Sequence, residues 1–300
     1  MTKLQHALRR NWGLYLMLVP AIVYLIVFHY FPMYGVTIAF KDFSARLGIM
    51  GSPWVGLKHF TRVFTSPNFL PIVGNTLVLS FYQLVVTFPL PILLALMINS
   101  CFSKRLGTVL KNITYAPYFI SVVVLVGMMF IMFAPRGVFN QILVFFGAQP
   151  RLFMGEEQYF RHMFVFSNVW QTTGWSSIIY MAALSGVSPE LHEAAVVDGA
   201  SKLRRVISID LPMIVPTAAI ILTLNVGGVM SLGFEKAYLM QTPLNIEIAE
   251  ILSTYVYKKG LLDIDYSYAA AVGLFNNVIN LVLLSAVNWF SRRITKSSLW

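Results

Sequence analysis

Residues 74–98 read GNTLVLSFYQLVVTFPLPILLALMI, a stretch without Asp, Glu, Lys or Arg. A helix needs about 20 apolar residues to cross the hydrocarbon layer of a bilayer, so this stretch is long enough to span it. Backbone N–H and C=O groups cannot bond to water inside the lipid, and in a helix they form hydrogen bonds with one another. Five further stretches without these charged residues lie at about 13–34, 113–133, 164–186, 214–232 and 268–290. We therefore predict an all-α, polytopic membrane protein with six transmembrane helices.

The composition agrees with a membrane protein. Of the 300 residues, 57% are hydrophobic and 11% are charged, whereas soluble domains have about 45–50% and about 25%. So few charges cannot cover a soluble globule, and the values argue against a soluble enzyme, a disordered chain and a collagen-like fibre. The single cysteine, Cys101, cannot form an intrachain disulfide, and no Cys/His cluster indicates a zinc site.

The basic residues predict the orientation. An uncleaved first span places the N-terminus in the cytoplasm, and 12 of the 22 Lys and Arg residues then fall in four short cytoplasmic segments. Those segments are 1–12, 99–112, 187–213 and 291–300. This bias follows the positive-inside rule and places both termini in the cytoplasm. Most of the net charge of +10 is thereby explained, so no nucleic-acid partner is expected.

The predicted spans contain almost no ionisable side chains. His29 lies near the outer end of the first span, and Glu235 and Lys236 lie just beyond the fifth. Proton-coupled carriers need acidic or histidine relays at membrane depth, and membrane enzymes need a nucleophile or metal ligands. The dipeptide Gly-Lys is absent, so this chain has no P-loop for ATP.

The cytoplasmic segment between the fourth and fifth spans has its own pattern. Ser188 suits a helix N-cap, Pro189 the first helical position and Gly199 a left-handed helix end. A second short helix is expected over about 200–209. The fixed positions of the segment read E-A-A-x3-G-x9-I-x-L-P, beginning at Glu193. An ordinary helix-turn-helix connection between two spans is the alternative interpretation.

This pattern resembles the EAA loop of binding-protein-dependent ABC importers. The residues that carry the resemblance, and would couple the chain to an ATPase, are Glu193, Ala194, Ala195, Asp198, Gly199, Ile209, Leu211 and Pro212. Segments 29–35, 39–42, 54–57 and 75–76 are similar to carbohydrate permeases of the MalF type, and 254–261 is similar to the LplB-type subgroup, which serves complex and often acidic oligosaccharides. Residues 240–243, Met-Gln-Thr-Pro, depart from the Thr-Gly-Gly-Pro of many sugar permeases, which makes a maltose-like or glycerol-phosphate-like substrate less favoured.

The resemblance implies a type I ABC importer permease fold at 13–290, with the coupling loop at 188–212 and an outer cap at 35–73. It also implies a set of partners in a bacterial cell membrane: a second homologous permease, two ATP-binding subunits that hold ATP and Mg²⁺, an extracellular solute-binding lipoprotein and an oligosaccharide. No cofactor and no catalysis are expected on this chain. The alternatives are a permease for another small solute, a six-span secondary carrier or membrane enzyme, and a membrane protein without a pore.

Polar side chains in the fourth and fifth spans are the candidates for the substrate pathway. We predict sugar contacts for Trp170, Gln171, Trp175 and Asn225. Amide and small polar residues also hold membrane helices together, so packing is the alternative for each of them. For Asn276, Asn277 and Asn280 in the sixth span packing is the preferred interpretation, and Gly227-Gly228 is expected to allow close helix packing or a kink.

Overall fold

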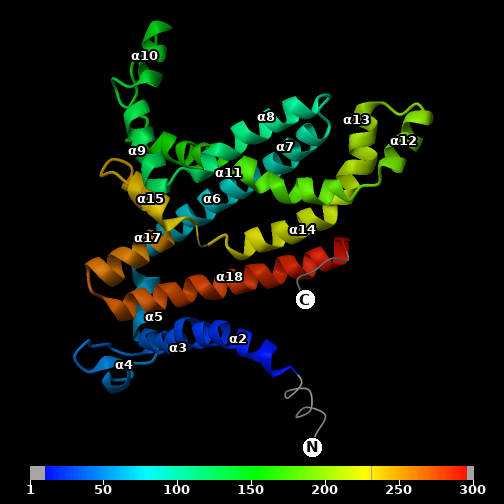
Figure 1. Ribbon diagram of the computed structural model, residues 1–300. Helices are drawn as coiled ribbons and strands as arrows, with labels where there is room; N and C mark the ends of the chain where they lie inside the picture. The colour runs from blue at the N-terminus through cyan, green and yellow to red at the C-terminus, as the bar shows by residue number, and fades with distance from the viewer. Residues whose placement is uncertain (1–10, 231, 296–300) are drawn as a thin grey trace, which may run out of the picture. The chain divides into compact units, whose positions relative to one another are not determined.

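The computed structural model describes residues 11–230 and 232–295. Within these ranges the chain is helical, and its only extended pairing is an isolated antiparallel bridge between Lys41 and Trp54. The chain divides into two compact units, residues 1–65 with 258–274 and residues 66–257 with 275–300 (Figure 1). Most of the predicted N-terminal segment, the end of the C-terminal tail and Ser231 lie outside the described residues.

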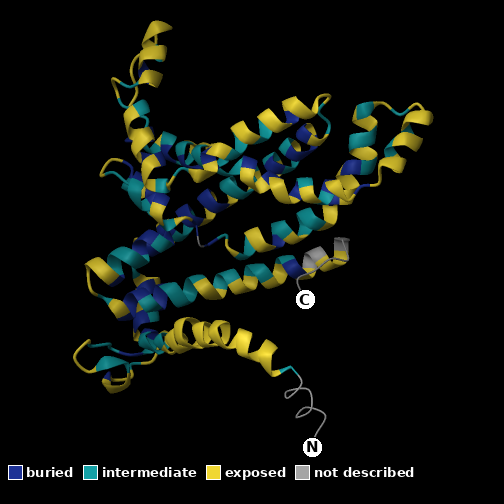
Figure 2. Cartoon of the chain, in the orientation of Figure 1, coloured by how far each residue is buried: buried dark blue, intermediate teal, exposed yellow. Residues whose placement is uncertain are grey.

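The first unit begins with a long apolar helix. It comprises α2 (Trp12–Leu25), the π-helical turn η1 (Ile26–Tyr30), α3 (Phe31–Met33) and the 3-10 turn η2 (Tyr34–Phe40). Together they form a candidate span of 29 residues, longer than the predicted 13–34. None of the residues of α2 is buried within the chain (Figure 2).

The same unit contains a small folded cap with α4 (Gly48–Gly51) and α5 (Lys58–Thr65). Lys58 Nζ donates to Asp42 Oδ2 at 2.6 Å, and this bond to an ammonium lowers the pKa of the Asp42 carboxyl. Arg62 pairs with Asp265 at 2.6 Å. The Ser267 hydroxyl donates to the Lys41 carbonyl, so the segment after η5 (Lys258–Leu262) is bonded to the cap.

The second unit is a bundle organised around α11 (Glu157–Ser185). This helix packs against α6 (Phe69–Thr87), α7 (Pro89–Asn99), α8 (Lys104–Tyr115) and α14 (Leu211–Gly227). The shorter helices of the unit are α10 (Val138–Phe145), α12 (Pro189–Val197), α13 (Lys202–Arg205), α15 (Phe234–Met240), α16 (Ile246–Ala249) and α17 (Leu252–Tyr257). The last helix, α18 (Tyr266–Thr295), begins in the first unit and continues in the second.

The predicted third span is broken in the structure. The helix from α8 continues through the 3-10 turn η3 (Ala116–Phe119) and then meets α9 (Val122–Met132) at 97°. Ile120 has an extended backbone, with ψ 126°, and Ser121 caps the new helix by accepting from the Val124 amide. Apolar composition predicted the stretch 113–133, but composition does not report this local change of direction.

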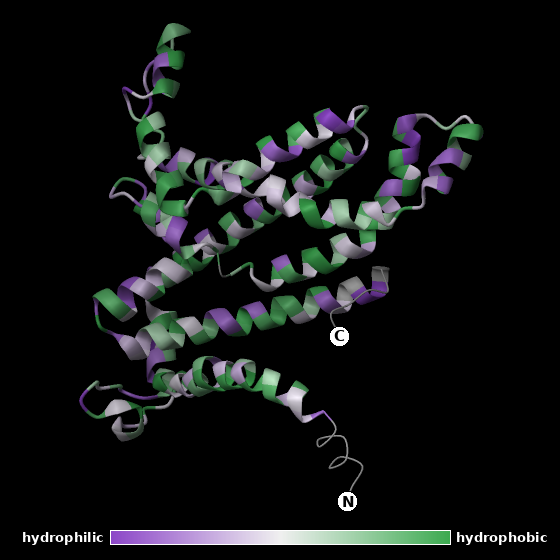
Figure 3. Cartoon of the chain, viewed as in Figure 1, coloured by the Kyte–Doolittle hydropathy of each residue, from purple (hydrophilic) through white to green (hydrophobic). Residues whose placement is uncertain are grey.

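Four helices are long and apolar enough to cross a membrane, and the bent pair α8–α9 brings the number to five among the described residues. The remaining predicted span, the fourth at 164–186, coincides with α11, whose Ser, Thr, Asn and Gln side chains lower its hydropathy. Figure 3 shows α11 as a paler helix than its apolar neighbours. The six predicted spans thus each correspond to a helix or a bent helix pair.

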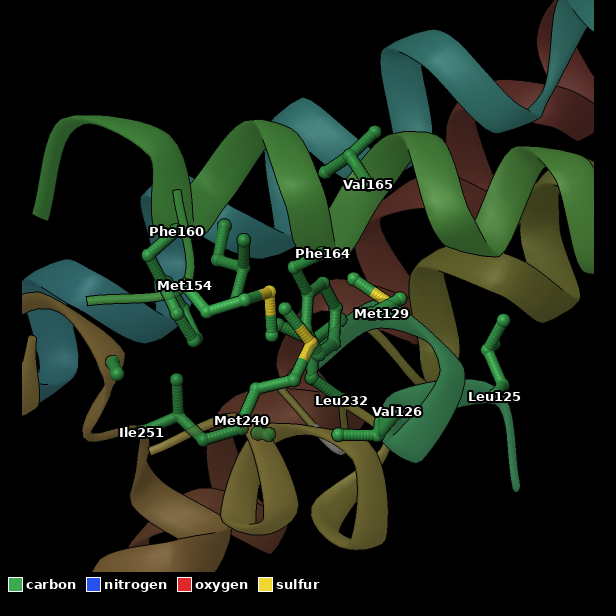
Figure 4. Close-up of a cluster of buried hydrophobic side chains, with 13 residues drawn as sticks. Leu125, Val126, Met129, Met154, Phe160, Phe164, Val165, Leu232, Met240 and Ile251 are labelled. Carbon is green, nitrogen blue, oxygen red and sulfur yellow. The ribbon is translucent and has the colours of Figure 1, made fainter. Parts of the chain in front are cut away.

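Two clusters of buried side chains hold the second unit together. One lies between α9, α11 and α15 and is built from large side chains such as Met129, Phe160, Phe164 and Met240 (Figure 4). The other joins α7, α11 and α14 through residues such as Ala95, Tyr180 and Ile214. Both clusters include α11, so the position of this helix is fixed along its length.

Gly174 lets α11 approach α8 closely. A Cβ atom at this position would overlap the backbone of Thr114. We predict that Gly174→Ala lowers the free energy of unfolding of the permease in the purified complex by about 1–3 kcal/mol, because backbone atoms must move to accommodate the methyl group. The melting temperature of the complex should fall accordingly. Gly127→Ala on α9 is the matched control, since no atom lies within 4 Å of its Cβ position. Equal melting temperatures for the two variants would contradict the close approach.

Candidate functional site

A cavity of about 830 Å³ lies between α6, α11 and α14 in the second unit. Side chains from all three helices line it, together with the segment that follows α14. Its polar lining residues are Ser80, Gln83, Thr87, Asn168, Thr172, Trp175, Ser176, Tyr180 and Asn225. A volume of this size lies within the range of pockets that hold small ligands.

Two amides in the cavity have unused hydrogen-bonding capacity. The side chains of Asn168 and Asn225 form no hydrogen bond to another residue in the part of the chain that the structure describes. Gln83 adds a buried carbonyl oxygen, Oε1, that lacks a partner in the same described part. Each amide offers two N–H donors and one acceptor, so the cavity wall can bond a ligand rich in hydroxyl groups.

The two predicted tryptophans occupy different environments. Trp175 lines the cavity and stacks on Tyr118, with ring centroids 4.4 Å apart and an angle of 4° between the planes. Trp170 is half exposed and does not line this cavity. Only Trp175 is therefore brought together with Asn225.

Gln171 has a structural contact in place of the predicted sugar contact. It is buried, and its amide Nε2 donates to the Ile120 carbonyl at 2.8 Å. This carbonyl lies at the break between η3 and α9, where the helix leaves it without an intrahelical partner. Gln171 is absent from the cavity lining, so the structure does not bring it together with Asn225.

The three asparagines of the sixth span differ in their surroundings: Asn277 is exposed, and Asn276 Oδ1 is buried without a partner among the described residues. Asn280 Oδ1 accepts from the Met230 amide at 3.0 Å and so holds the segment after α14. Beside it, a Cβ atom on Gly227 would contact Leu284, so α14 and α18 approach closely there. Both observations agree with packing roles for Asn280 and Gly227.

The predicted coupling loop has the expected local structure. The Ser188 hydroxyl accepts from the Glu190 amide and begins α12. Gly199 has φ +74°, and the following amide of Ala200 donates back to the Ala195 carbonyl at 2.8 Å. The second predicted helix is present as α13 followed by the π-helical turn η4 (Val206–Asp210), which leads directly into α14.

A side-chain hydrogen bond connects the two ends of the loop. His192 Nε2 on α12 lies 3.1 Å from Asp210 Oδ1, and Asp210 is buried at the start of α14. Both residues border a cavity of about 440 Å³ that Glu193, Lys202 and Arg205 also line. The His192–Asp210 contact joins α12 to the start of α14.

The rest of the loop is presented to the surroundings. None of the residues of α12 is buried, and Val197 is 87% exposed. Glu193, Ala194, Asp198 and Gly199 are exposed as well, while Ile209 packs against the cluster that joins α7, α11 and α14. In Figure 3 the loop alternates hydrophilic and apolar segments. The motif is therefore exposed along α12 and packed against the bundle at Ile209.

The family model described as "Binding-protein-dependent transport system inner membrane component" matches residues 87–296. This chain belongs to that family. The match covers the cavity helices α11 and α14 and the whole coupling loop. The permease is accordingly a subunit of a membrane transport system and not an enzyme.

Two relatives from Bacillus subtilis (strain 168) cover almost the whole permease. The polygalacturonan/rhamnogalacturonan transport system permease protein YteP is 41% identical over 288 residues, which are 96% of this chain and 90% of the relative. Protein LplB is 38% identical over 295 residues, which are 98% of this chain and 93% of the relative.

A solved structure has the same fold. It is the crystal structure of a bacterial ABC transporter involved in the import of the acidic polysaccharide alginate, with a TM-score of 0.92 and 39% identity. The superposition covers 98% of the permease and all of the solved chain. A second crystal structure, of a bacterial alginate ABC transporter in complex with an alginate pentasaccharide-bound periplasmic protein, is also similar, with a TM-score of 0.92 and 38% identity. The predicted sugar-permease fold is confirmed.

Three polar residues of the cavity were not predicted from the sequence. These residues are Ser80, Gln83 and Thr87 on α6, a strongly apolar helix with few polar side chains. Their spacing of three and four residues places them on one helical face, and this signal was present in the sequence.

We predict that Gly199→Val uncouples the permease from its ATPase. A β-branched residue at φ +74° costs about 1–2 kcal/mol, and the α12–α13 turn must distort. Sugar-stimulated ATPase activity of the assembled complex should fall severalfold. Gly199→Asn is the matched control, because Asn tolerates the left-handed conformation, and it should retain coupling. Wild-type activity in Gly199→Val would contradict this role.

Proposed function

We propose that this permease imports acidic oligosaccharides derived from polysaccharides, delivered by an extracellular binding lipoprotein. The observation that carries the proposal is the similarity, over nearly the full chain, to permeases named for polygalacturonan/rhamnogalacturonan and for alginate. Polygalacturonan and alginate are built from sugars that carry carboxylates. The free amides of the α6–α11–α14 cavity suit such a ligand because they can donate to both hydroxyl and carboxylate oxygens.

We propose that Asn225, Trp175, Asn168 and Gln83 form the substrate pathway. These residues come from α6, α11 and α14 and face one cavity. Trp175 is held by its stack on Tyr118, so it offers a rigid apolar surface next to the amides. A rigid aromatic surface beside hydrogen-bond donors matches a sugar ring, which has apolar faces and polar edges.

The transport step is proposed to be driven from the cytoplasmic side. Two partner subunits hold ATP and Mg²⁺, and the exposed surface of α12 docks on one of them. When the ATPases close, α12 moves as a rigid body, and the His192–Asp210 pair transmits the movement to α14. Because α14 lines the cavity, its displacement changes access to the sugar. A second homologous permease completes the channel, and both termini lie in the cytoplasm.

The function is tested with the complete complex in proteoliposomes. The permease is co-expressed with its partner permease, ATPase and binding lipoprotein, and uptake is measured over a panel of acidic and neutral oligosaccharides and other small solutes. ATP-dependent uptake of acidic oligosaccharides supports the proposal. Uptake of only neutral sugars or of another solute class would reject it.

Two amide substitutions separate sugar contact from packing. Asn225→Ala should leave the complex assembled and lower uptake by up to about tenfold, because one hydrogen bond to the sugar is lost. Gln171→Ala should instead lower the melting temperature, since it leaves the buried Ile120 carbonyl unpaired. Uptake is measured per assembled complex, with assembly followed by pull-down of the partner subunits. If Asn225→Ala abolishes assembly and leaves transport per complex unchanged, Asn225 is a packing residue.

A further inference from the structure

A buried lysine lies beside α11 without a counter-ion. Lys236 on α15 is 5% exposed, and its ammonium donates to the Phe164 carbonyl at 2.9 Å. The same ammonium lies 5.0 Å from the centre of the Phe164 ring. No carboxylate pairs with Lys236 within the described ranges. Burial lowers the pKa of Lys236 to about 7, because removal from water destabilises the charged form.

A second cation on α11 is also only partly compensated. The Arg161 guanidinium donates to Asn75 Oδ1 at 3.1 Å, and its Nε is buried without a partner in the described part of the chain. Asn75 is itself fixed, because its amide donates to the carbonyls of Glu247 and Glu250. The guanidinium is therefore held by a neutral acceptor while its charge remains without a paired carboxylate.

Both cations lie beyond the same end of the cavity. Asn168 is the first residue of α11 in the cavity lining, and Phe164 and Arg161 precede it by one and two helical turns. At a rise of about 1.5 Å per residue, Phe164 is displaced along the helix by about 6 Å and Arg161 by about 10 Å. In the other direction α11 leads to the coupling loop, so the cations lie at the end away from the ATPase.

We infer that Lys236 and Arg161 form an electrostatic selectivity element at the outer end of the cavity, which favours negatively charged oligosaccharides over neutral ones. This inference rests on the proposed function. An anion brought near these side chains favours the charged form of Lys236 and is attracted by the charge of Arg161, and a low-dielectric surrounding lets these fields act over several ångströms. The carboxylates of an acidic sugar that approaches Asn168 would supply the missing charge.

A purely structural role of Lys236 would require a hydrogen-bond donor but no charge. To connect α15 to the Phe164 carbonyl, a neutral donor is sufficient, whereas attraction of an anion requires the charge. Lys236→Gln keeps an N–H donor and removes the charge, and Lys236→Arg keeps the charge. Arg161→Gln is the corresponding neutral variant on α11. Arg136→Gln removes an exposed cation from the segment before α10 and is the matched control for net charge.

The experiment uses proteoliposomes that contain the whole complex with saturating, sugar-loaded binding lipoprotein. The probes are an oligogalacturonide and its methyl ester, which has the same chain without the negative charges. Saturation of the binding lipoprotein by each probe is verified separately. We expect the ratio of acidic to esterified uptake to fall roughly fivefold or more in Lys236→Gln and Arg161→Gln. Lys236→Arg and Arg136→Gln should keep the wild-type ratio.

The outcomes separate the inference from the proposed function. An unchanged ratio in assembled Lys236→Gln and Arg161→Gln complexes would overturn the selectivity element and leave the permease function standing. An equal fall in uptake of both probes would show a structural role and would overturn it as well. Failure of the wild-type complex to take up either probe would reject the proposed substrate and, with it, the inference.

Discussion

Polar side chains in a membrane helix must find partners inside the protein, because hydrocarbon offers none. The helix α11 carries more of these polar side chains than the other predicted spans, and the neighbouring helices of the second unit provide their surroundings. The helices α6, α7 and α14 surround it, Gln171 bonds to the break before α9, and Asn168 faces the cavity. The same constraint therefore fixes the core of the bundle and leaves a polar interior surface.

The number and location of the spans were predictable because membrane thickness imposes a length that the sequence displays directly. The coupling loop was predictable as well, since Ser188 and Gly199 have local conformational preferences that do not depend on distant contacts. The break at Ile120 was not predictable. Its free carbonyl is bonded by Gln171, which is 51 positions away in the chain.

Only part of the site was predictable, because it also depends on contacts between distant parts of the chain. Composition selects polar residues in a span, but only the rotation of the helix decides whether they face a cavity or a neighbour. Asn225 and Trp175 face the cavity, whereas Gln171 and Trp170 do not, although all four were equally plausible from the sequence. Ser80 and Gln83 show the converse, since a strongly apolar helix can still present a polar face.

The first helix contributes nothing to the packed interior, because none of the residues of α2 is buried. Within its own unit, burial of its side chains adds no free energy that would hold this helix in place. The choice of detergent in a purification then becomes a structural variable for α2 while the bundle around α11 retains its own core. Stability measured on the extracted permease would report the bundle, and the behaviour of α2 would depend on the medium in which it is measured.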